Sequence, residues 1–95
     1  MEADPSYLGA KLGVARMNTA LDRYGDAIRM YEAVLQEQLP AETFRAVSED
    51  LAYVQVTAGD VGGAGLTLRA AGLSEEAVAS KLAQIIAAAA ERFTR

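Results

Sequence analysis

Residues 7–35 read YLGAKLGVARMNTALDRYGDAIRMYEAVL, and the spacing of their apolar side chains indicates the fold class. Apolar residues recur at alternating intervals of three and four, the period of one face of a helix and of a heptad repeat. The series is Tyr7, Ala10, Val14, Met17, Leu21, Tyr24, Ile28, Tyr31 and Leu35. It follows Asp4-Pro5, a helix-starting pair, and precedes Leu39-Pro40, where proline disfavours further helix. The sequence therefore predicts helix over about residues 5–38.

Two arrangements of residues 5–38 fit this spacing. A continuous helix of about 30 residues is roughly 45 Å long and leaves an apolar end that a second molecule can cover. A hairpin that turns near residues 18–23 instead forms two shorter antiparallel helices. No glycine or proline lies within residues 18–23, and this favours the continuous helix.

The remainder of the chain is also expected to be helical. Helices are predicted over about residues 41–57 and 75–94, the second starting after Ser74, a good N-cap residue. The segment 61–71 follows a glycine-rich stretch and reads as either a helix or a loop. A competing interpretation makes residues 53–57 and 66–69 the strands of a β-hairpin. The fold class that we expect is all-α, with antiparallel helical hairpins or a small helical bundle in a single domain over residues 1–95.

Composition narrows the class of function. The net charge is −4, and no run of Lys or Arg is present, so nucleic acid is not an expected partner. The longest apolar run, residues 85–90, is too short to span a bilayer, so no membrane partner is expected. The first five residues are acidic, unlike a secretory signal, and the chain has no Cys. We therefore expect a cytoplasmic location.

The sequence offers little for catalysis. It contains no His and no Cys, which removes the commonest general base and the thiol nucleophile. Asp22 and Asp26 are spaced to share a helix face and a cation, but neighbouring Arg23 and Arg29 favour a solvated surface. The glycine-rich stretch has no lysine to complete a phosphate loop. We expect no catalytic residue, cofactor, metal ion or small-molecule substrate, and hence not an enzyme.

Part of the chain resembles a tetratricopeptide repeat (TPR). Tyr24, Ala27, Tyr31 and Pro40 resemble the aromatic, small, aromatic and proline positions of the second helix of that repeat. A second, weaker copy continues through Leu51-Ala52 and the turn glycine Gly59, and ends with Ala64, Leu68 and Ala71. The two copies span about residues 12–72. The spacing of 37 residues from Ala27 to Ala64 exceeds the usual 34. The resemblance implies a helical groove that receives a peptide or another protein.

These observations predict a protein–protein interaction module, as an adaptor, an assembly factor or a small chaperone. The residues expected to bind the partner are Tyr24, Ile28, Tyr31 and Leu35, because tyrosine suits interfaces through its apolar body and polar tip. Packing in the core is the alternative role for these side chains. The alternative function is a homo-oligomeric scaffold that associates through the heptad stripe of the first helix. A third, an acidic mimic of nucleic acid, is disfavoured because the acids form no dense stripe.

Overall fold

A computed structural model describes residues 5–93, and every regular element in that range is an α-helix. The elements are α1 (Pro5–Ala20), α2 (Tyr24–Leu35), α3 (Ala41–Thr57), α4 (Val61–Ala70) and α5 (Glu75–Phe93). Within the described part of the chain there is no strand. The prediction of an all-α fold is confirmed.

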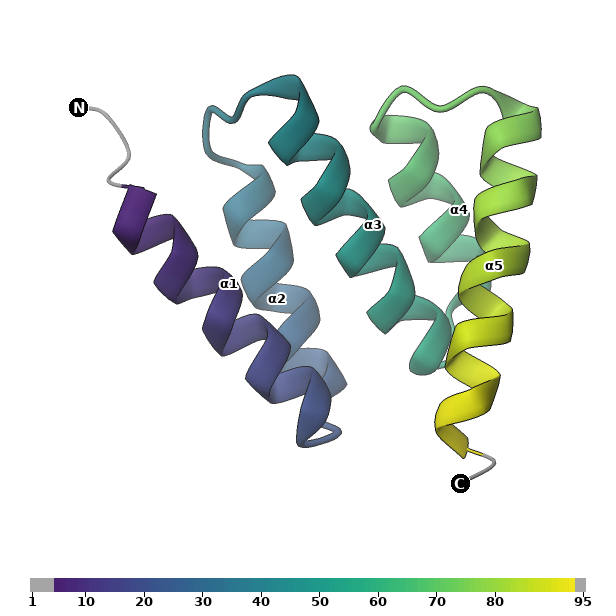
Figure 1. Cartoon of the computed structure of the whole chain (residues 1–95), viewed down its shortest axis with the longest axis horizontal. Coiled ribbons are helices and arrows are strands. Elements are labelled where there is room, and N and C mark those ends of the chain that lie inside the picture. Colours follow the sequence, from purple (N-terminus) through teal and green to yellow (C-terminus); the bar gives the residue numbers. More distant parts are fainter. Residues whose placement is uncertain (1–4, 94–95) are drawn as a thin grey trace.

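The helices run alternately down and up the molecule and form two layers (Figure 1). In that view α1, α3 and α5 make the nearer layer, and α2 and α4 lie behind them. Each helix packs against the next one along the chain, and α5 also contacts α3. The Cα trace is 16 Å deep along its shortest axis, as two packed layers of helices require. Because α2, α4 and α5 all contact α3, this helix is the centre of the fold.

The continuous helix expected over residues 5–38 is wrong, because the chain reverses between α1 and α2. Asp22 lies in the left-handed region with φ of 61°. Its N–H donates to the carbonyl of Thr19 (3.1 Å), and the N–H of Arg23 donates to the carbonyl of Asn18 (2.8 Å). This pair of hydrogen bonds is the Schellman pattern that ends many helices, usually with glycine in the left-handed position. Aspartate is one of the few other residues that tolerate this conformation.

The hairpin is favoured because it buries side chains that a single straight helix leaves in water. Ala15 of α1 and Ala27 of α2 are both fully buried. Their small side chains let the two helices approach closely, so that larger neighbours fill the space beside them. The second helix ends at Leu35 rather than near residue 38, and residues 36–40 connect it to α3.

Three glycines of the glycine-rich stretch, Gly62, Gly63 and Gly65, lie within α4. The β-hairpin interpretation of residues 53–69 is therefore also wrong. Asp60 caps α4 by accepting a hydrogen bond from the N–H of Gly63 at 2.9 Å. Ala64 and Leu68, one turn apart on α4, are completely buried. Burial of this apolar face offsets the low helix propensity of the glycines. Residues 61–71, expected as a helix or a loop, are therefore helical as far as Ala70.

The other two helices have nearly the expected bounds. α3 covers Ala41–Thr57, and α5 covers Glu75–Phe93, while the expected end at residue 94 lies outside the described residues. Ser74 caps α5, since its Oγ accepts a hydrogen bond from the N–H of Ala77 at 3.2 Å. None of the helices in residues 5–93 has the length and apolarity to cross a membrane.

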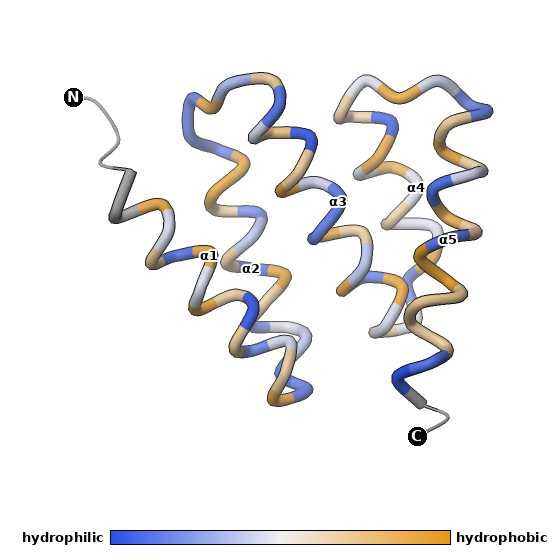
Figure 2. Tube along the Cα trace, viewed as in Figure 1, coloured by the Kyte–Doolittle hydropathy of each residue, from blue (hydrophilic) through white to orange (hydrophobic). Residues whose placement is uncertain are grey.

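The apolar core consists of two clusters that meet along α3. The first lies between α1, α2 and α3 and contains Ala15, Ala27, Tyr31, Val34, Val47, Leu51 and Val54. The second lies between α3, α4 and α5 and contains Ala52, Ala64, Leu68, Val78 and Ile85. Figure 2 shows apolar residues recurring along every helix, interleaved with polar residues. The half-buried Tyr53 packs against both clusters and so links them.

α2 and α4 each bury a residue with a small side chain followed, four positions later, by one with a large side chain. Ala27 and Tyr31 of α2 are 0% and 2% exposed, and Ala64 and Leu68 of α4 are both 0% exposed. Each pair places a small residue one helical turn before a large one. The alanine permits close approach of the neighbouring helix, and the large side chain fills the adjacent space.

Candidate functional site

Of the four residues predicted to bind a partner, Tyr31 belongs to the first core cluster and the other three pack against it. Tyr31 is only 2% exposed, and burial raises the pKa of its hydroxyl, with the carboxylate of Asp50 adding to the shift. Tyr24, Ile28 and Leu35 are half-buried and pack against the same cluster. Tyr31 therefore packs in the core, and Tyr24, Ile28 and Leu35 lie at its edge.

A groove lies on the side of the molecule formed by α2 and α4, with α3 as its floor. Its volume is about 700 Å³. The lining residues are Arg29, Glu32, Ala33, Leu35 and Gln36 from α2, Phe44, Ser48 and Leu51 from α3, and Thr67 and Ala70 from α4. We call this the α2–α3–α4 groove. Leu35 is the one member of the predicted set that lines it.

The lining combines apolar side chains with a few polar groups. Leu35, Phe44 and Leu51 supply the apolar surface, and charged or amide side chains of α2 stand along one wall. Binding sites for ligands and for partner side chains commonly have this composition and a volume of about 300–1,000 Å³.

Ser48 is unusual among the buried hydroxyl residues of the described helices. Its side chain is 1% exposed, and its Oγ has no hydrogen-bond partner among the described residues. Thr19 and Thr57, which are also buried, instead donate to the carbonyl one turn earlier, at 3.0 and 2.8 Å. An unpaired buried hydroxyl costs about 1–3 kcal/mol, so its place in the lining of a groove suggests a role beyond folding.

Ser48→Ala should therefore stabilise the protein. We expect the free energy of unfolding to rise by about 1 kcal/mol more than in Ser80→Ala, as measured by urea denaturation. Ser80 is an exposed serine in α5, so its replacement reports the helix propensity gain alone, about 0.5 kcal/mol. Equal effects of the two substitutions would show that the hydroxyl of Ser48 finds a partner in solution.

The charges beside the groove are unevenly compensated. Arg29 on the α2 wall forms an ion pair with Asp26. Arg69, next to the lining residue Ala70 on α4, binds both carboxylate oxygens of Glu75, at 2.8 and 3.1 Å. Glu32 lines the groove and has no ion pair with any side chain that the structure describes. Of the two charged residues that line the groove, Arg29 and Glu32, only Glu32 has no ion pair with a described side chain.

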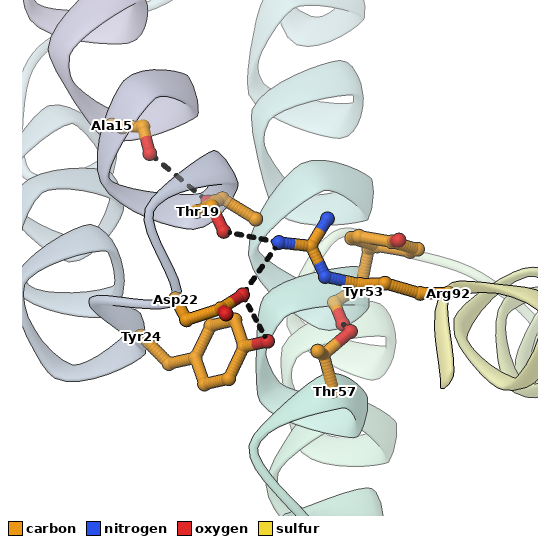
Figure 3. A network of polar contacts seen from close by, with 7 residues as sticks. All are labelled: Ala15, Thr19, Asp22, Tyr24, Tyr53, Thr57 and Arg92. Atoms are coloured by element: carbon orange, nitrogen blue, oxygen red, sulfur yellow. Dashed lines mark hydrogen bonds and ion pairs between the residues drawn. The ribbon is translucent and has the colours of Figure 1, made fainter. Parts of the chain in front are cut away.

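A polar network joins the end of α5 to the turn between α1 and α2 (Figure 3). The guanidinium of Arg92 donates to the carbonyl oxygen of Thr19 at 2.7 Å and to Oδ1 of Asp22 at 2.8 Å. The hydroxyl of Tyr24 donates to the same carboxylate oxygen at 2.9 Å, and its ring centroid lies 5.9 Å from the guanidinium. Residues 70 or more positions apart are thus held together, and the two ends of the helical array are linked.

The network should appear in the titration of Asp22. Hydrogen bonds from Arg92 and then from Tyr24 hold the pKa of this carboxyl below its ordinary value of 3.8. A lowered pKa means that the contact stabilises the fold above about pH 4 and ceases to do so as pH falls through the lowered value. In Arg92→Gln we expect the pKa of Asp22, followed by carbon NMR of the carboxyl group, to rise toward 3.8. An unchanged pKa would contradict the contact.

Carboxylates do not gather into a candidate metal centre within residues 5–93. Asp22 and Asp26, which the sequence spaced to share a cation, lie in the turn and in α2, respectively. Each is engaged by a different arginine, Arg92 and Arg29.

Three apolar residues of α1 and of the turn that follows it are exposed to solvent. Val14, Met17 and Leu21 are 45%, 63% and 57% exposed, and all three belong to the predicted heptad series. The side chains of α1 that reach the core are instead Leu8, Leu12 and Ala15. Val14, Met17 and Leu21 therefore belong to neither core cluster.

No protein-family model, curated protein or solved structure matches this chain in the comparisons that we made.

Proposed function

We propose that the protein is a protein–protein interaction module that receives a helical segment of its partner in the α2–α3–α4 groove. The observation that carries this proposal is the open apolar groove with the unpaired hydroxyl of Ser48 in its lining. Adaptor, assembly-factor and chaperone roles all use such a surface. The cytoplasmic location expected from the sequence is part of the proposal.

The arrangement of the walls favours a helix as the occupant. α2 and α4 belong to one layer (Figure 1), and the groove separates them above α3. A helix placed between them extends that layer and packs on three helices at once. The floor extends from Phe44 to Leu51, which is about 10 Å or two helical turns. A short amphipathic helix therefore matches the length of the apolar surface.

We further propose that the helical hairpins α1–α2 and α3–α4 are related as tetratricopeptide-like repeats. The buried pairs Ala27–Tyr31 and Ala64–Leu68 support this, because both members of the pair recur after 37 residues. In such an array, α5 covers the apolar face of the second hairpin as a capping helix.

Self-association through α1 is the second candidate function, favoured by the exposure of Val14, Met17 and Leu21. Three side chains cover much less than the about 800 Å² per partner that a stable interface buries, so a dimer formed through them alone is weak. Light scattering at increasing concentration separates the candidates: a stable dimer that Met17→Glu disrupts favours self-association, and a monomer favours the groove.

Selection from a displayed library of helical peptides tests the groove directly. We expect binders whose affinity falls at least tenfold in Ala33→Arg, since Ala33 lines the groove and a long side chain there obstructs it. Ala83→Arg makes the same change at an exposed position of α5 and should leave binding unaltered. Binders that respond equally to both variants, or no binders at all, would contradict the proposal.

A further inference from the structure

We propose that the partner helix is amphipathic and basic, with a Lys or Arg that faces Glu32 and one polar side chain within its apolar face that hydrogen-bonds to Ser48. This inference rests on the proposed function, because it specifies the chemistry of the helix that enters the α2–α3–α4 groove.

Charge complementarity supports the basic flank. Arg29, which lines the groove, and Arg69, which precedes the lining residue Ala70, are already paired with Asp26 and Glu75. The carboxylate partner of each arginine already offsets its charge. Glu32 has no such partner among the described side chains, and the whole chain carries a net charge of −4. A cationic residue beside the apolar face of the incoming helix therefore gains an attraction that an acidic one does not.

The buried hydroxyl supports the polar residue. A partner that covers the groove with apolar side chains alone leaves Ser48 without a hydrogen bond and excludes water from its surroundings. Serine reaches other staggered rotamers by rotation about χ1, which can turn the hydroxyl toward the groove that it lines. A Ser, Thr, Asn or Gln of the partner then satisfies it. A helix with this residue discriminates against helices whose face is entirely apolar.

Glu32 and Ser48 lie on different helices, and this determines how the basic and the polar residue are spaced on the partner helix. Glu32 stands on the α2 wall and Ser48 on the α3 floor. The polar residue of the partner therefore lies in the middle of its apolar face, and the basic residue lies at the border of that face on the side of α2. Residues three or four apart on a helix have this relation.

The peptides selected from the helical library provide the test. We expect groove-dependent binders, defined by their loss of affinity in Ala33→Arg, to be enriched in Lys or Arg at the border of the apolar face. Glu32→Lys should weaken them about three- to tenfold at low salt, with a smaller effect at 0.5 M salt. Replacing the basic residue of the peptide by Glu should restore affinity for Glu32→Lys. Glu76→Lys, the same charge change on α5 outside the groove lining, should have little effect.

Ser48→Ala tests the second contact. It should weaken peptides with a central polar residue about fivefold, and leave unchanged the same peptides with Leu at that position. Groove-dependent binders that are acidic or uncharged, or that tolerate both Glu32→Lys and Ser48→Ala, overturn the inference and leave the proposed function standing. If no selected peptide depends on Ala33, the proposed function fails as well.

Discussion

Leu68→Ala should lower the free energy of unfolding by about 3 kcal/mol, because it leaves a cavity in the second core cluster. Leu68 is 0% exposed and packs between α3, α4 and α5, where the helices cannot fully collapse around the missing atoms. The measurement is urea denaturation followed by circular dichroism, with the transition slope fitted separately for each variant.

Leu66→Ala is the matched control for this prediction. Leu66 lies on the same helix and is 66% exposed, so we expect a change within about 0.5 kcal/mol. Similar losses at the two positions would mean that α4 does not pack through Leu68, and the described arrangement of α3, α4 and α5 would then be incorrect.

Tyr31→Ala should lower the free energy of unfolding by about 4 kcal/mol, the usual cost of removing a buried aromatic ring. Tyr31 is 2% exposed and packs in the first core cluster with Val34, Val47 and Leu51. Small domains have free energies of unfolding of only about 5–15 kcal/mol, so a considerable fraction of the variant is expected to be unfolded at 37 °C. Thermal and urea denaturation measure the effect.

Tyr31→Phe separates the ring from its hydroxyl. It keeps the packing of the ring, so we expect a loss of about 1 kcal/mol or less. The opposite pattern, in which Tyr31→Ala folds with normal stability and loses only its binding partner, would contradict this packing and favour a partner-binding role for Tyr31.

Three helices of this chain end with the same pair of backbone hydrogen bonds, but only two of these ends are marked in the sequence by a glycine. α3 and α4 end before Gly59 and Gly72, which have φ of 94° and 90°, and glycine at these positions marks a helix end. α1 ends before Asp22, with the same pair of hydrogen bonds but without a glycine. Because aspartate is also common within helices and on their surfaces, residues 18–23 carry no comparable signal.

The candidate site was harder to predict than the fold. Its lining includes Ala33, Gln36, Ser48 and Thr67, residue types that form no recognisable motif together. They come from three helices and become neighbours only after α2 and α4 pack on α3. Tyr24 and Tyr31 of α2 have the spacing of residues that pack in or against the first core cluster. Because aromatic residues with this period serve packing and binding equally well, the sequence did not distinguish the two roles.

The sequence by itself determined that the chain is helical, where α3 and α5 start, and that Ser74 caps α5. These features depend on local interactions, which residues within one or two helical turns make among themselves. Only the tertiary structure decided that residues 5–38 form a hairpin, that the heptad stripe of α1 faces solvent and that α2 and α4 enclose a groove. Each of these depends on which faces are buried together, and that free energy arises from contacts between residues far apart in the chain.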